Sequence, residues 1–196
     1  MAEDSLLLAE KISTMIIDHN PYMEISKILD DAEDSNSSID WGIVGDRIVA
    51  ILQSGVSGIF RQINFLDFAM QAYERDGEDS ILKKFEAQFT LAQIESDQGG
   101  LKRKFELYED LVESASSRLK ENSTEDPFYY WLTRPLNRLA QLTQRWKGRE
   151  VAEPLWHRLV KVSSEAGEID GVFSVMKDNA DWFIKQNPEL FPEHKD

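Results

Sequence analysis

Apolar residues recur along this chain at spacings of three and four, and no segment alternates apolar and polar residues with a period of two. The clearest example carries Leu101, Phe105, Tyr108, Val112 and Ala115. Residues at these spacings lie on one face of an α-helix, whereas a half-buried strand requires strict alternation. The sequence therefore predicts an all-α protein.

Glycine, proline and short polar segments divide the chain into about nine expected helices. Asn20-Pro21 is typical of a helix start, and Gly148 and Gly167 are expected to end helices. Residues 30–40 are rich in Asp, Ser and Asn and are expected to form a loop, and Pro135 is expected to kink its helix. The expected helices cover about 4–17, 21–29, 41–52, 59–77, 79–97, 101–119, 127–146, 149–167 and 169–186.

The composition excludes several classes of protein. Of the 196 residues 41% are apolar, which is too many for a wholly disordered chain. No cysteine occurs, which excludes disulfides, thiolate catalysis and cysteine-ligated metal centres. The N-terminus is acidic where a signal peptide would be basic, and no run of about 18 apolar residues would span a membrane. We expect a soluble, cytoplasmic protein with no membrane partner.

The formal charge of −14 is unevenly distributed along the chain. Residues 1–40 hold ten acids and two bases, whereas residues 134–161 hold seven bases and two acids. An acidic protein is repelled by the phosphate backbone, and neutralised phosphates supply most of the affinity for generic duplexes. Nucleic acid is therefore not an expected partner.

A shift of 48 residues reveals an internal repeat. Residues 91–94 (LAQI) align with 139–142 (LAQL), and residues 107–108 (LY) align with 155–156 (LW). Seven of the 22 positions in 91–112 are identical to those in 139–160. Each unit comprises a helix with a Leu-Ala pattern, a turn that contains Gly, and a second helix that carries a Leu-aromatic pair.

This unit resembles the tetratricopeptide repeat, in particular its kinesin-light-chain-like variety, whose Ala-Glu-Pro-Leu-Tyr signature has a counterpart in Ala-Glu-Pro-Leu-Trp at 152–156. The resemblance covers about residues 80–165. The period of 48 departs from the family's period of about 34 residues, and Lys104 stands where the earlier unit should carry its second Ala. The resemblance implies antiparallel helical hairpins in an α-solenoid that binds a partner on its concave surface.

The organisation that we expect is one all-α domain of residues 1–196. Its expected parts are divergent N-terminal helices (1–78), two repeat-like hairpins (79–166), a C-terminal capping helix (167–187) and a tail (188–196). The N-terminal helices would form a cap, a dimer surface or further degenerate repeats. We expect these ten residues to be buried, because they recur at the repeat offset or lie on apolar stripes: Leu91, Ala92, Tyr108, Leu111, Leu139, Ala140, Ala152, Leu155, Trp156 and Leu159.

The sequence carries no recognisable catalytic or metal-binding motif. The three histidines, His19, His157 and His194, are far apart, and no nucleophile elbow, phosphate-binding loop or His-Glu-x-x-His helix occurs. The acidic stretch 30–40 lacks the glycine and the bidentate glutamate that a calcium loop needs. We expect no enzyme activity, no cofactor and no metal.

The helix expected at 127–146 combines four consecutive aromatic residues, 128–131, with a row of arginines. A helix cannot bury four consecutive side chains on one side, and arginines at spacings of four and seven can align along a face. Aromatic and arginine side chains dominate many protein interfaces. The sequence predicts a partner site, suited to an acidic peptide or a carboxylate, formed by Tyr129, Tyr130, Arg134, Arg138 and Arg145. The alternative is that the aromatics pack on neighbouring hairpins and the arginines neutralise the chain's own acidic N-terminal segment.

The leading hypothesis is a non-catalytic interaction module or adaptor that binds a protein or peptide partner in a helical groove. The alternative is an acidic inhibitor, of the immunity type or a nucleic-acid mimic, that neutralises a basic partner. It requires the acids of residues 1–40 and 162–196 to form one continuous surface. A third hypothesis, an enzyme or nucleotide-binding helical bundle, requires a buried polar cavity.

Overall fold

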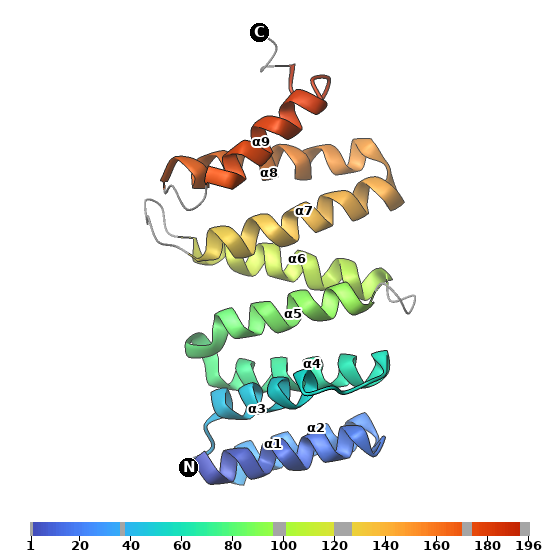
Figure 1. Cartoon of the computed structure of the whole chain (residues 1–196), viewed down its shortest axis with the longest axis vertical. Helices are drawn as coiled ribbons and strands as arrows, with labels where there is room; N and C mark the ends of the chain where they lie inside the picture. Colours follow the sequence, from blue (N-terminus) through green and yellow to red (C-terminus); the bar gives the residue numbers. More distant parts are fainter. Residues whose placement is uncertain (1, 36–37, 96–100, 120–126, 170–173, 193–196) are drawn as a thin grey trace. The chain divides into compact units, whose positions relative to one another are not determined.

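A computed structural model describes residues 2–35, 38–95, 101–119, 127–169 and 174–192. Within these ranges the chain forms nine α-helices, one 3-10 turn and no strand (Figure 1), which confirms the prediction of an all-α protein. The elements are α1 (Ala2–Ile17), α2 (Tyr22–Ser35), α3 (Trp41–Gln53), α4 (Ile59–Asp76), the 3-10 turn η1 (Gly77–Ser80), α5 (Ile81–Glu95), α6 (Leu101–Arg118), α7 (Phe128–Lys147), α8 (Arg149–Ile169) and α9 (Ser174–Gln186).

The chain divides into two compact units, residues 1–101 and residues 102–196. The division lies between α5 and α6, inside the segment 79–166 that the sequence presents as two repeat-like hairpins. The first of those hairpins therefore combines a helix of each unit, whereas the second, α7 and α8, lies wholly within the second unit.

In the first unit, α3 packs against α1 and α4, and α4 also contacts α2 and α5. Its core consists of aliphatic and aromatic side chains from all five helices, among them Ile12, Ile16, Ile25, Leu29, Val44, Ile48, Phe65, Phe68 and Phe85. Helices α3 and α4 approach closely at one point. A Cβ atom on Gly45 would lie 2.3 Å from Cε1 of the buried Tyr73, so only glycine fits there.

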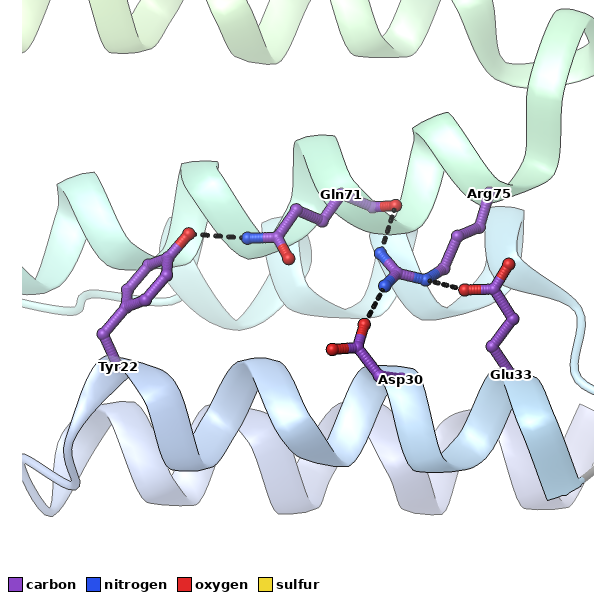
Figure 2. A network of polar contacts seen from close by, with 5 residues as sticks. All are labelled: Tyr22, Asp30, Glu33, Gln71 and Arg75. Carbon is purple, nitrogen blue, oxygen red and sulfur yellow. Dashed lines mark hydrogen bonds and ion pairs between the residues drawn. The ribbon is translucent and has the colours of Figure 1, made fainter.

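Helix α2 is longer than the sequence pattern indicates, and this corrects the expectation of a loop from residue 30. The Arg75 guanidinium on α4 donates to Asp30 at 2.6 Å and to Glu33 at 2.7 Å (Figure 2). One turn earlier on α4, the amide of Gln71 donates to the hydroxyl of Tyr22 at 2.7 Å. The contacts of Arg75 lie in the C-terminal part of α2, which stays helical through Ser35 although residues 30–35 carry no apolar stripe.

In the second unit, α7 and α8 pack against each other across Gly148, and α9 packs on α8. Gly148 has a φ of 96°, which a residue without a Cβ adopts at little cost, so the expected helix break is found there. The three helices and the segment that follows α9 share one buried cluster: Ala140, Ala152, Trp156, Val160, Ala180, Leu190 and Phe191. Helix α6 is attached to α8 by a hydrogen bond of 2.9 Å from Arg158 to the hydroxyl of Ser116.

One further helix boundary differs from expectation. Helix α8 continues past Gly167 to Ile169, since an internal glycine costs a helix only about 1 kcal/mol. Helix α7 runs without interruption from Phe128 to Lys147 through Pro135. The glycine pair 99–100, which is expected to end the helix at 79–97, lies outside the described residues. The same holds for most of residues 123–127, which are expected to form a loop, and for the first residues of the last expected helix.

Eight of the ten residues expected in the core are buried. The exceptions are Leu155 and Leu159 on α8, which are only partly buried and pack against the edge of the buried cluster. Leu159 is left partly open because it faces a groove on the surface of the second unit.

Candidate functional site

A groove of about 570 Å³ lies between α7, α8 and α9. Helix α7 contributes Tyr130, Thr133, Arg134, Asn137 and Gln141, α8 contributes Trp156, Leu159, Val160 and Ser163, and α9 contributes Ala180, Trp182 and Phe183. This volume falls within the range of about 300–1,000 Å³ that is usual for ligand pockets in proteins. All three helices belong to the second unit, so the groove is built within one compact body.

The α7 wall is a polar stripe along one helix face. Tyr130, Arg134, Asn137 and Gln141 follow one another at spacings of four, three and four, which brings them onto the same side of the helix. The guanidinium of Arg134 donates to the hydroxyl of Tyr130 and lies 5.3 Å from the centre of its ring. The Gln141 amide donates to Oδ1 of Asn137 at 3.1 Å. The stripe is therefore ordered by contacts between its own members.

The opposite wall is aromatic and held in place. The rings of Trp156 and Phe183 stack with 4.3 Å between centroids and 21° between planes. The Trp156 indole N–H donates to Oε1 of Gln144 at 2.8 Å, and Phe183 also meets the ring of Phe191 edge-on at 5.8 Å. At the rim, the side chain of Trp182 is 62% exposed. The groove thus has one polar and one apolar wall, with an exposed indole at its edge.

The electrostatic character of the groove differs from that of the chain. Among the described residues that line it, Arg134 is the one that carries a charge, and no carboxylate lines it. Helix α7 as a whole carries four basic residues and neither Asp nor Glu, although the chain has 36 acids. Burial raises the pKa of Tyr108 on α6, and the cations of Arg138 and Arg134 oppose that shift.

The five predicted site residues lie in three different environments: two line the groove, one is buried, and two are exposed outside the groove. Tyr130 and Arg134 line the groove together, as the sequence suggests. Tyr129 is only 6% exposed, because the next residue along a helix lies about 100° around the axis, and here that side faces the core. We therefore leave Tyr129 out of the candidate site.

The other two arginines are exposed on α7 but lie outside the groove lining. Arg138 donates to Oε1 of Gln141 at 3.4 Å. Arg145 lies three turns beyond Arg134, and its guanidinium is 5.7 Å from the ring centre of Trp146. Arg145 therefore provides a matched position at which charge can be changed on the same helix without touching the groove.

Sequence reasoning missed the α8 and α9 sides of the groove. Leu159 was expected in the core, and α9 was expected only to cap the array. The adjacent pair Trp182-Phe183 could have indicated an exposed aromatic side chain on this helix, because two adjacent aromatics on a helix cannot both face the same core. The structure places Phe183 against Trp156 and leaves Trp182 at the rim.

Among the described residues there is neither a metal-binding cluster nor a membrane-spanning helix. No group of three or more His, Cys, Asp or Glu side chains there is arranged to hold a metal ion. No helix in the described ranges combines the length and the apolar character required to cross a bilayer.

No protein-family model matches the sequence, and no curated protein matches it significantly. The tetratricopeptide-like character of residues 80–165 therefore stays a prediction from their own pattern.

Proposed function

We propose that this chain is a non-catalytic interaction module that binds a peptide segment of a partner protein in the groove between α7, α8 and α9. The observation that carries the proposal is an ordered, partly apolar groove whose rim presents Trp182, Tyr130 and Arg134. Tryptophan, tyrosine and arginine are the residue types that most often dominate binding energy in protein interfaces. An exposed tryptophan beside an apolar slot offers a large contact area that water solvates poorly.

The acidic-inhibitor alternative receives less support from the first unit. Five of its acids, Glu10, Asp30, Glu33, Asp46 and Glu74, form ion pairs with four bases on other helices or turns of the same unit. Carboxylates engaged in this way are less available to neutralise a basic partner. The other part of that hypothesis, one surface made from residues 1–40 and 162–196, concerns two units that are described separately.

The proposal is tested by selecting peptides from a random display library against the full chain and measuring their affinity by fluorescence anisotropy. Two variants alter the groove without removing core atoms: Trp182→Ala and Arg134→Glu. Each should weaken the selected peptides by tenfold or more, which corresponds to about 1.4 kcal/mol. Far-ultraviolet circular dichroism checks that helicity is unchanged.

Each groove variant has a matched control on the same unit. Trp146 is 58% exposed and lies outside the groove, so Trp146→Ala removes an equally exposed indole. Arg145→Glu reverses a charge three turns from Arg134, also outside the lining. Both controls should bind the peptides like the parent chain. Failure to select any binder, or equal losses in controls and groove variants, would rule out this groove as the partner site.

A further inference from the structure

The turn that joins α7 to α8 is exposed, basic and partly apolar. Residues 144–151 are all exposed around Gly148, where the chain reverses direction (Figure 1). The five residues 145–149 (RWKGR) carry three bases and no acid. Trp146 is 58% exposed and Val151 is 53% exposed. This end of the hairpin therefore presents two apolar side chains among several cations.

The first turn of α6 adds a further cation to this end of the second unit. Nζ of Lys147 lies 4.4 Å from the ring centre of Phe105, which brings the end of α7 next to the start of α6. Lys102 stands three residues before Phe105, and residues three apart lie on the same face of a helix. Its side chain is 93% exposed. We define the basic tip by these five residues of the second unit: Lys102, Arg145, Trp146, Lys147 and Val151.

Two cations of the basic tip contact aromatic rings. The guanidinium of Arg145 is 5.7 Å from the ring centre of Trp146, and Lys147 lies over Phe105. A contact between a cation and a ring leaves the charge on the side chain, whereas an ion pair would neutralise it. In the described part of the chain neither of these cations is paired with a carboxylate. Both remain able to attract an anionic surface.

Three acids adjoin the basic tip and set the limit of its positive charge. Two of them form exposed ion pairs and the third lies in the turn itself: Glu106 with Lys102 at 3.4 Å, Glu189 with Arg149, and Glu150. Exposed ion pairs are weak and exchange readily with other charges. The attraction for an anion therefore depends mainly on Arg145 and Lys147.

The excess of negative charge belongs mainly to the first unit. Residues 1–101 hold 19 acids and seven bases, whereas residues 102–196 hold 17 acids and 15 bases. At physiological salt, charges more than about 10 Å apart are largely screened from each other. An anionic surface that touches the basic tip consequently responds to the cations of the tip more than to the net charge of the chain.

An exposed tryptophan among cations matches the surface of an anionic lipid bilayer. Indole rings concentrate between the headgroups and the acyl chains, where the ring meets apolar atoms and the N–H stays hydrated. Basic side chains are attracted to the negative leaflet. We infer that the basic tip docks the second unit on an anionic bilayer, with Trp146 and Val151 at the headgroup level and Arg145 and Lys147 on the lipid charges. A nucleic acid would use the same cations, but Val151 offers it neither a charge nor a stacking surface.

This contact lies on the surface of the bilayer. The expectation of no membrane partner rests on the lack of an apolar run that could span a bilayer and on the acidic N-terminus, and surface binding needs neither a span nor a signal peptide. The basic tip also shares no residue with the lining of the groove, so the inference does not rest on the proposed function.

The inference is tested by sedimenting the full chain with vesicles at physiological salt. Vesicles of equal parts phosphatidylserine and phosphatidylcholine should carry the protein down, and vesicles of phosphatidylcholine alone should not. Arg145→Glu should weaken the binding about tenfold, because it replaces a cation by an anion at the membrane surface. Trp146→Ala and Val151→Glu should each weaken it by a similar factor, since they remove the apolar contact. Circular dichroism checks that the variants keep their helicity.

The position of the indole is tested by fluorescence quenching. Bromine atoms on the acyl chains of phosphatidylcholine, mixed with phosphatidylserine, quench a tryptophan that reaches the acyl boundary. The full chain should be quenched when it binds these vesicles, and Trp146→Phe, which keeps an apolar ring but removes the fluorophore, should lose that quenching. Unchanged quenching in Trp146→Phe, or no binding of the parent chain to the anionic vesicles, would overturn the inference.

Matched variants at the groove separate this inference from the proposed function. Trp182→Ala and Arg134→Glu alter the same two residue types outside the basic tip and should bind the anionic vesicles like the parent chain. Losses in these variants as large as those of Trp146→Ala and Arg145→Glu would count against the tip, whatever the outcome of the peptide selection. A labelled single-stranded RNA is the last arm. RNA that binds more tightly than the vesicles, through Arg145, would assign the tip to nucleic acid and overturn the inference.

Discussion

The indole of Trp156 stacks on the ring of Phe183 at 4.3 Å and donates a hydrogen bond to Gln144 at 2.8 Å. The side chain therefore connects α8 to α9 and to α7, and it is only 5% exposed. It belongs to the buried cluster of the second unit and at the same time forms a wall of the groove. The stability of this unit and the shape of its groove consequently depend on the same residue.

Trp156→Ala should destabilise the second unit by about 3–5 kcal/mol, the usual cost of truncating a buried aromatic side chain and leaving a cavity. Trp182→Ala removes the same group from the surface and should cost no more than about 0.5 kcal/mol. Urea unfolding followed by circular dichroism measures both. Equal midpoints for Trp156→Ala and the parent chain would contradict the packing of α8 on α7 and α9.

Gly45→Ala should destabilise the first unit, because the new Cβ would lie 2.3 Å from the ring of Tyr73 and α3 would have to move away from α4. Overpacking of this kind costs about 1–3 kcal/mol. Gly42→Ala is the matched control on the same helix. Its Cβ would meet mainly the carboxylate end of Asp76, which can rotate, so the loss should be smaller. Thermal unfolding of the two variants gives the comparison, and a Gly42→Ala loss as large as that of Gly45→Ala would count against the close approach.

Arg75→Gln should loosen the C-terminal half of α2. It removes the cation that binds both Asp30 and Glu33, and an ion pair whose carboxylate is more than half exposed contributes about 0.2–1 kcal/mol. Hydrogen exchange of the α2 amides should become faster, while α3 changes little. Arg47→Gln breaks a single exposed pair with Glu10 and should alter exchange much less. Unchanged protection of α2 in Arg75→Gln would show that the ion pairs do not hold this helix.

Alkaline pH should destabilise the first unit through Tyr73. Burial, followed by the nearby Asp46 carboxylate, raises the pKa of its phenol well above the ordinary value of 10.0. The unfolded chain loses this proton near pH 10 while the native chain retains it, so the unfolded state binds fewer protons and stability falls as pH rises. The free energy of unfolding should therefore decline above about pH 10, with a smaller slope in Tyr73→Phe.

Generic duplex DNA should not bind measurably at physiological salt, because the chain carries a formal charge of −14. Among the described helices, α7 is the one with a net positive charge, because it carries four basic residues and neither Asp nor Glu. Fluorescence anisotropy with a labelled duplex tests the expectation. Micromolar binding that weakens steeply with salt would contradict this prediction. If Arg138→Glu reduced that binding, α7 would be identified as a phosphate-binding surface.

The amino-acid sequence by itself determined where helices form and which of their faces are apolar. The period of three and four residues specifies the face of α6 that carries Tyr108 and Leu111, and both are buried. Gly148 ends α7 as expected, because only the local backbone conformation matters there. The pairing of Tyr130 with Arg134 was also accessible from spacing alone, since residues four apart are neighbours on any helix.

Tertiary structure alone decided which contacts those helices make. Helix α2 extends to Ser35 with the help of Arg75, more than 40 residues away, and no local pattern in α2 reports that partner. The groove needs Trp156 and Phe183 from two further helices, and their meeting depends on how α8 and α9 pack rather than on the spacing within either. Tyr129 and Tyr130 have the same side chain, yet one is buried and the other lines the groove. Spacing places a side chain around its own helix axis, but the neighbour that packs on that side determines whether it becomes core or binding surface.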